Sequence, residues 1–301
     1  METEIYETIH AGGAGFYPAS RGLLAVWGKE AVQFLDGMIT NDMKTLPDGD
    51  QMLAAFPNAQ GRLLAVVRVL RDGERYLIES EDATREKVFV NLSRFTLAGD
   101  FFIEDLSEMY AYLEMFGASE LDIDAAVEGI IRFESPFGSS LFVPLDHSEP
   151  LQTQLVESGA AEIPNDTFEV LRIEAGVPKF GVDMDETTIV PELGIDPLIS
   201  YTKGCYIGQE IIARIHFRGH VAKQLTGIET EQSSLTAKSE LLSLEGKNAG
   251  RITSVTHSPS MNKTTALGYV RYDYLEEGTE LKANDLPVTV KKLPFVKFSV
   301  S

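Results

Sequence analysis

Residues 203–210 read Lys-Gly-Cys-Tyr-Ile-Gly-Gln-Glu and contain the only cysteine of the 301-residue chain. The thiol of Cys205 lies two positions from Lys203 and just before a predicted helix start. A nearby cation and the partly positive end of a helix both favour a thiolate over a thiol. Free cysteines are also among the most buried residue types. This stretch alone therefore does not decide whether Cys205 is a reactive or a structural cysteine.

The composition is that of an ordinary globular protein, with 44% hydrophobic and 24% charged residues. A net charge of −20 argues against a general nucleic-acid or anionic-membrane binder, because both need a basic surface. One cysteine excludes an intrachain disulfide and an all-cysteine metal site. No apolar run is long enough to span a membrane, and the first ten residues lack the apolar core of a signal peptide. We expect a cytoplasmic protein with no metal, nucleic-acid or membrane partner.

The hydrophobic pattern changes near residue 225. Before it, helical spacing and short apolar runs predict helices mixed with antiparallel strands, as in an α+β fold with ferredoxin-like layers. The predicted strands are 23–27, 51–56, 63–70, 76–79, 101–106, 109–116, 130–133 and 140–143, and the predicted helices are 29–39, 83–95, 119–127, 149–158 and 167–175. After residue 210 the apolar residues alternate, which predicts a strand, and from 226 onward short strands predict a small antiparallel barrel or sandwich. We therefore expect two domains, an α+β region of two subdomains at 1–225 and a β-barrel domain at 226–301.

Arg172 and Glu174 lie at the end of a predicted helix, directly before a long loop at residues 176–197. A carboxylate there could accept paired N–H donors from a heteroaromatic ring such as a pterin or a guanine. The spacing alone favours a surface ion pair between Arg172 and Glu174, which contributes little. Loops of this length inside compact domains are usually functional or disordered.

Two other groups of polar residues could bind a metal but lack the pattern for it. Asp183, Asp185 and Glu186 resemble half of a cation site without the remaining ligands, so a solvated acidic loop is the better interpretation. His216 and His220 are four residues apart, a spacing that suits metal binding on a helix, but the pattern around them predicts a strand and a turn.

Residues 203–210, followed by Ala213 and Arg214, resemble the signature of the YgfZ family of folate-binding proteins, which are relatives of the glycine-cleavage T-protein. The resemblance covers nearly the whole chain and includes residues 34–42 (FLDGMITND), 58–63, 172–178 and 250–270. It implies a T-protein-like fold, in which ferredoxin-like subdomains and a C-terminal antiparallel β-barrel surround a central tetrahydrofolate site.

The same resemblance implies roles for individual residues. Lys203 and Cys205 match the functional lysine and cysteine of the signature, and Glu174 matches the carboxylate that holds the pterin. Phe180 falls where the T-protein has an aromatic residue. The expected folate-binding residues are Glu174, Arg172, Phe180 and Tyr206.

One departure separates this chain from the T-protein, which has its reactive-centre aspartate where this chain has Leu-Ala-Val at 64–66. Without that carboxylate, proton transfer near the folate nitrogens lacks its obvious group. The resemblance therefore implies a tetrahydrofolate-binding protein that supports the synthesis or repair of iron–sulfur enzymes, with those enzymes or their assembly proteins as partners. The alternative is a folate-dependent one-carbon transferase of aminomethyl type, so whether the protein is an enzyme stays open. The anionic tail of a folate needs local cations, for which Arg214, Arg218 and Lys223 are candidates.

Overall fold

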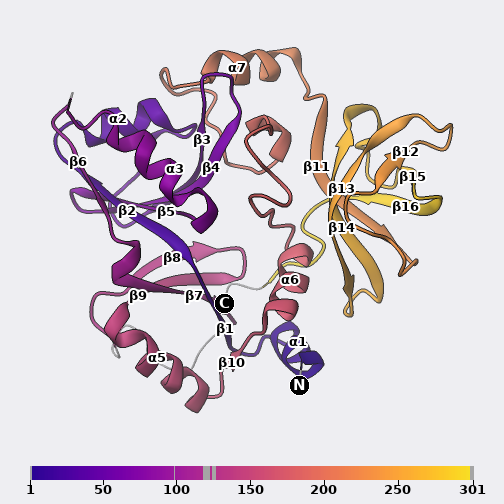
Figure 1. The fold of residues 1–301 in the computed structure, drawn as a ribbon, viewed down its shortest axis with the longest axis horizontal. Coiled ribbons are helices and arrows are strands. Elements are labelled where there is room, and N and C mark those ends of the chain that lie inside the picture. Colours follow the sequence, from indigo (N-terminus) through magenta and orange to yellow (C-terminus); the bar gives the residue numbers. More distant parts are fainter. Residues whose placement is uncertain (1, 98, 118–122, 124–126, 299–301) are drawn as a thin grey trace.

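The computed structural model describes residues 2–97, 99–117, 123 and 127–298, which form two stacked sheets and a barrel (Figure 1). The first sheet has the strand order β3-β4-β5-β2-β6, and every neighbouring pair is antiparallel. Its strands are β2 (Arg21–Trp27), β3 (Gln51–Pro57), β4 (Leu63–Asp72), β5 (Arg75–Glu81) and β6 (Phe102–Asp105). Helices α2 (Ala31–Met38) and α3 (Asp82–Ser93) pack on this sheet, where Leu35 and Leu92 join Val69 in one buried cluster.

The second sheet stacks against the first and has the order β10-β1-β7-β9-β8. Its strands are β1 (Gly15–Ala19), β7 (Tyr110–Phe116), β8 (Ile131–Ser135), β9 (Gly138–Pro144) and β10 (Ala161–Glu162). Helix α5 (Leu145–Glu157) packs on it through Leu151 and Leu155. Leu23 and Leu77 of the first sheet meet Phe133 of the second in a shared cluster. The result is a helix–sheet–sheet–helix arrangement.

A buried ion-pair network also joins the two sheets. Arg68 and Glu79 face each other in the β4–β5 register and lie 2.7 Å apart, and Arg21 of β2 also pairs with Glu79. Tyr112 of β7 contacts this network through its hydroxyl, 3.3 Å from Arg68. Breaking a buried pair of this kind is costly because it leaves an uncompensated charge.

The C-terminal part is a closed barrel of order β11-β14-β13-β12-β15-β16, whose ends meet because β11 also pairs with β16. Its strands are β11 (Lys223–Thr230), β12 (Glu240–Leu242), β13 (Asn248–Ser258), β14 (Lys263–Arg271), β15 (Glu280–Ala283) and β16 (Leu286–Lys291). Ile228, Ile252 and Val288 fill its interior. The predictions of an α+β fold and of an antiparallel barrel are both confirmed.

Helix α6 (Asn165–Glu174) joins the three parts. Leu171 packs against helix α1 (Glu2–His10), whereas Ile173 packs against Leu225 and Leu267 of the barrel. From α6 the chain runs as a loop, residues 175–208, through the middle of the molecule to helix α7 (Gln209–Arg218) at its edge (Figure 1). The short 3-10 helices are η1 (Met43–Thr45), η2 (Ser107–Met109), η3 (Val190–Leu193) and η4 (Tyr272–Tyr274).

Two predicted elements differ from the structure. The alternating residues after Glu210 form helix α7, so the predicted strand is wrong. Helix α5 begins at Leu145, one turn before the predicted 149–158, and α1 and β1 were not predicted. The predicted helix at 119–127 lies largely outside the described residues. No helix within the described ranges is long and apolar enough to cross a lipid bilayer.

Candidate functional site

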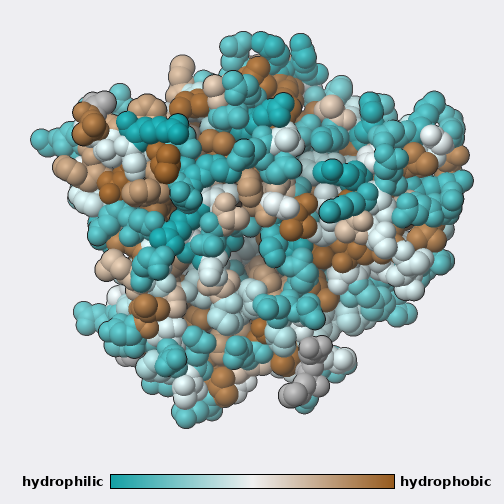
Figure 2. All heavy atoms as spheres, viewed as in Figure 1, coloured by the Kyte–Doolittle hydropathy of each residue, from teal (hydrophilic) through white to brown (hydrophobic). Residues whose placement is uncertain are grey.

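The loop of residues 175–208 is attached to the first sheet along one side. The backbone N–H of Leu63, at the start of β4, donates to the Thr188 carbonyl at 2.8 Å. The Thr40 hydroxyl donates to the Leu198 carbonyl at 2.7 Å. Figure 2 shows that the face on which the loop runs in Figure 1 is largely hydrophilic.

On the other side, Arg172 ties this loop to the barrel. Its guanidinium donates to the Val177 carbonyl at 2.6 Å, to Asp183 at 2.8 Å and to the Ser254 hydroxyl of β13 at 3.0 Å. It also pairs with Glu169 one turn earlier on α6. Charged neighbours raise the pKa of Arg172 even though burial opposes this, and the side chain is only 4% exposed. Arg172 is therefore a buried structural hub.

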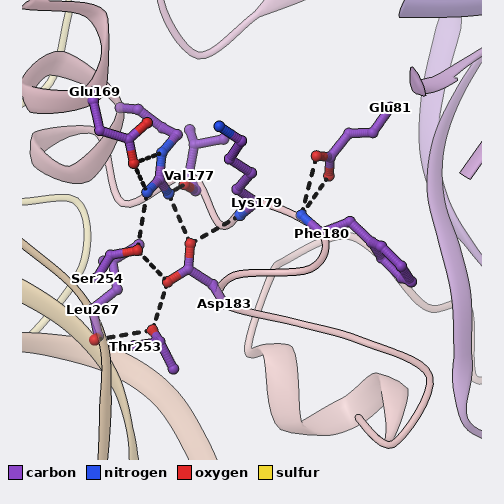
Figure 3. Close-up of polar contacts among 10 residues, drawn as sticks. Glu81, Glu169, Val177, Lys179, Phe180, Asp183, Thr253, Ser254 and Leu267 are labelled. Carbon is purple, nitrogen blue, oxygen red and sulfur yellow. Dashed lines mark hydrogen bonds and ion pairs between the residues drawn. The ribbon is translucent and has the colours of Figure 1, made fainter. Parts of the chain in front are cut away.

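Asp183 is the counterpart of Arg172 in the loop (Figure 3). Besides Arg172, its carboxylate accepts the Lys179 backbone N–H at 3.0 Å, the Thr253 hydroxyl at 2.5 Å and the Ser254 hydroxyl at 2.6 Å. Its exposure is 2%. The expectation of a solvated acidic loop is wrong for this residue, because four donors hold it in the interface with the barrel.

Glu174 is fully buried, and protein groups occupy its carboxylate. Oε1 accepts the hydroxyls of Tyr6 and Ser258, each at 2.5 Å, and Oε2 lies 2.8 Å from His10 Nε2. The expected surface pair between Arg172 and Glu174 is wrong, since both residues are buried and each has other partners. Glu174 thus connects α6 to α1 and to the end of β13.

A carboxylate that the sequence did not single out, Glu81, lies beside Phe180 (Figure 3). Both of its oxygens are within 3.0 and 3.2 Å of the Phe180 backbone nitrogen. Burial raises the pKa of Glu81. The Lys87 ammonium lies 5.0 Å from the centre of the Phe180 ring and pairs with Glu186. The signal that could have found Glu81 is its place at the end of a strand, directly before a helix.

Lys203 is buried and caps the end of α2. Its ammonium donates to the carbonyls of Asp36, Ile39 and Asn41 at 2.7, 3.0 and 2.7 Å, and it lies 3.1 Å from the Asp36 carboxylate. An ammonium has three N–H donors, so these carbonyls occupy it fully. Burial lowers the pKa of Lys203, and Asp36 opposes that shift. Cys205, two residues on, is exposed.

Tyr206 turns back into the protein. It packs in a buried cluster with Leu63 and Met184, and the partly buried Phe180 packs on the same cluster. The Lys203 ammonium lies 5.2 Å from its ring centre, and burial raises the pKa of Tyr206 to about 12. Phe180 and Tyr206 therefore share one cluster, whereas Cys205 lies on the surface next to it.

The cations after the signature are mostly paired. Arg214 of α7 forms an ion pair with Glu210 at 2.7 Å, and Lys223 lies 3.8 Å from Glu192. Arg218 is exposed at the end of α7. Two of these three cations, Arg214 and Lys223, therefore already have an acidic partner.

His216 and His220 do not form a metal site. The His216 ring stacks on Tyr201 with centroids 3.7 Å apart, and the His220 ring stacks on Tyr272 at 3.9 Å. Within the described part of the chain, no group of three or more His, Cys, Asp or Glu side chains could hold a metal ion.

Comparison with known proteins identifies the domains. The GCVT N-terminal domain matches residues 18–139, and the glycine cleavage T-protein C-terminal barrel domain matches residues 223–297. An aminomethyltransferase of Rubrobacter xylanophilus is 28% identical over 307 aligned residues, which cover 93% of this chain and 82% of that protein.

The fold is also found among solved structures. The glycine cleavage system aminomethyltransferase T of Bartonella henselae matches with a TM-score of 0.87 and 20% identity, covering 98% of this chain and 91% of that one. The T-protein-like fold expected from the sequence is thereby confirmed. The chain is a T-protein-like protein and a homologue of aminomethyltransferases, built from the N-terminal domain and the C-terminal barrel domain of that family.

Proposed function

We propose that the protein binds tetrahydrofolate, or a one-carbon derivative of it, in the central region between the first sheet, the loop 175–208 and the barrel. We further propose that it is a folate-dependent one-carbon transferase of aminomethyl type. The observation that carries this proposal is the T-protein domain pair, together with a homologous aminomethyltransferase aligned over 93% of the chain. Apolar and acidic residues around the loop also suit the chemistry of a folate.

A pterin is a flat ring with apolar faces and an edge of N–H donors. Ligand sites commonly offer apolar and aromatic walls with a few polar groups that fix the orientation. Here Phe180 and Tyr206 belong to one apolar cluster, and the Glu81 carboxylate lies at the Phe180 backbone. The folate would supply the nitrogens that carry the one-carbon unit, and these protein groups would bind and orient its ring.

A second candidate function is support of iron–sulfur enzymes, and the exposure of Cys205 favours it. The thiol lies next to the buried Tyr206 cluster and within the eight-residue signature. One thiolate cannot hold a cluster alone, so a partner protein would supply the remaining ligands. The absence of a carboxylate at 64–66 also favours a role other than glycine cleavage.

Isothermal titration with tetrahydrofolate tests what both candidates share, and no binding to the wild-type protein would refute both. Aminomethyl transfer is then measured as release of ammonia and formation of methylenetetrahydrofolate from an aminomethyl donor. A transferase should give turnover that survives Cys205→Ala. An iron–sulfur maintenance protein should give no such turnover, and cells carrying Cys205→Ala should lose iron–sulfur enzyme activity while the purified variant still binds tetrahydrofolate.

A further inference from the structure

Glu81 has few hydrogen-bond donors for a half-buried carboxylate beside the loop. Among the residues that the structure describes, its hydrogen-bond donor is a single backbone N–H, that of Phe180, shared between its two oxygens at 3.0 and 3.2 Å (Figure 3). An ionised carboxylate offers about four acceptor positions. Most of the acceptor positions of Glu81 therefore have no protein donor among the described residues.

The neighbouring carboxylates have cations or several donors close by, and Glu192 of the loop, which likewise has few donors, lies 3.8 Å from the Lys223 ammonium. Glu79 is paired with Arg21 and Arg68. Asp183 accepts four hydrogen bonds from protein groups, and Glu174 is held by α1 and the end of β13. Buried acceptors normally have partners, and leaving one without them is costly. Among the described residues no side-chain cation lies within ion-pair distance of Glu81, so a ligand that brings N–H donors finds there an acceptor that no protein cation occupies.

The strand register gives an independent reason to place Glu81 at the site. In the β4–β5 pair, Val67 lies opposite Ser80 at the end of the paired segment, so Glu81 directly follows the last paired residue of β5 and Val66 directly precedes its partner on β4. Val66 belongs to the segment 64–66, which contains no acidic residue. The adjacent strand thus brings a carboxylate to a segment that has none of its own.

We infer that Glu81 is a ligand-binding residue whose carboxylate accepts N–H donors from the edge of the pterin ring. This inference rests on the proposed folate binding and deepens it by naming the orienting acceptor. The half-buried position of Glu81 strengthens such a bond, because the carboxylate is partly removed from water. Burial also raises the pKa of Glu81, opposed by the charges of Arg21 and Arg172 and assisted by that of Glu79.

The test compares tetrahydrofolate binding by the wild type, Glu81→Gln and Glu86→Gln, an exposed acid of the same helix region used as a matched control. Glutamine keeps an acceptor for the Phe180 N–H but replaces the second acceptor with a donor, so the loop contact can persist. We expect Glu81→Gln to weaken binding by about 10- to 100-fold, since hydrogen bonds to charged groups are among the stronger ones. Glu86→Gln should bind as the wild type does.

A change in the ligand tests whether Glu81 contacts the pterin edge itself. An analogue in which the 2-amino group of the pterin is replaced by methyl should bind the wild type more weakly than tetrahydrofolate. The wild type and Glu81→Gln should differ less in affinity for this analogue than for tetrahydrofolate, because the analogue has lost the 2-amino donor and keeps only the ring N–H.

Three results would overturn the inference while leaving folate binding intact. These are unchanged tetrahydrofolate binding by Glu81→Gln, an equal fold-loss for both ligands in that variant, and wild-type affinity for the analogue equal to that for tetrahydrofolate. The last result needs no variant and holds even if Glu81→Gln is unstable. Absence of tetrahydrofolate binding by the wild type would instead refute the proposed function.

Discussion

Replacing Arg172 by Met should detach the central loop from the barrel. The guanidinium is buried and contacts Glu169, the Val177 carbonyl, Asp183 and Ser254. Methionine keeps the apolar stem but leaves the buried Asp183 carboxylate without its cation. Removing one partner of a buried ion pair costs about 3–5 kcal/mol. We expect the lower end of this range, since Lys179, Thr253 and Ser254 still donate to Asp183.

Urea unfolding followed by circular dichroism measures this loss, and limited proteolysis reports cleavage within the loop 175–208. The double variant Arg172→Met/Asp183→Asn is the control, because it removes the stranded charge. It should recover more than about 1 kcal/mol relative to Arg172→Met, the usual size of coupling between contacting residues. A loss below about 1 kcal/mol in Arg172→Met, with no change in proteolysis, would show that the hub contributes little.

Three further outcomes follow from single residues. Lys203→Met should lower the free energy of unfolding by about 3–5 kcal/mol in urea, because it leaves buried acceptors without a donor. Gly208→Ala should lower the free energy of unfolding by about 1–3 kcal/mol, because Gly208 has φ +81° and the added Cβ would lie 2.4 Å from the Asn58 carbonyl oxygen. Gly219→Ala is the control: Gly219 has φ +95° but open space around it, so the loss of unfolding free energy should be smaller. Burial and hydrogen bonding raise the pKa of Tyr6 from 10.0 to about 12. The contribution of the neutral Tyr6 hydroxyl to the stability of the fold is therefore complete below pH 10 and is lost as the pH rises toward 12. Alkaline unfolding should therefore be less steep in Tyr6→Phe, and equal slopes would contradict this.

The sequence predicted those elements whose apolar pattern is caused by burial. In β4 and β5 the apolar side chains face a core, and the strands were found within a few residues of their observed bounds. The pattern misled at α7, where Ile211, Ala213, Ile215 and Phe217 alternate although Ile212 is the buried residue of the helix. Helix α7 lies on the surface, and Phe217 is 84% exposed. The alternation of apolar residues in α7 is therefore not caused by burial of one face.

The site was harder to predict, because spacing along the chain does not reveal partners far away in sequence. Arg172 and Glu174 are two residues apart, yet their main partners come from residues 6, 183, 254 and 258. One usable signal was present: Arg68 interrupts an apolar strand, and Glu79 interrupts the next one. The two pair directly in the β4–β5 register. An acid and a base within adjacent apolar strands thus predict a buried pair, and Glu81 follows two residues later.

Glu174 has a consequence for the order in which the protein can assemble during synthesis. Its side chain binds Tyr6 and His10 near the beginning of the chain, and its backbone carbonyl accepts the N–H groups of Phe295 and Val296 near the other end. The junction is incomplete until the last of these residues has left the ribosome. Until then a nascent chain carries a carboxylate and a carbonyl with missing partners, so the junction around α6 closes only after residues 295 and 296 have been synthesised.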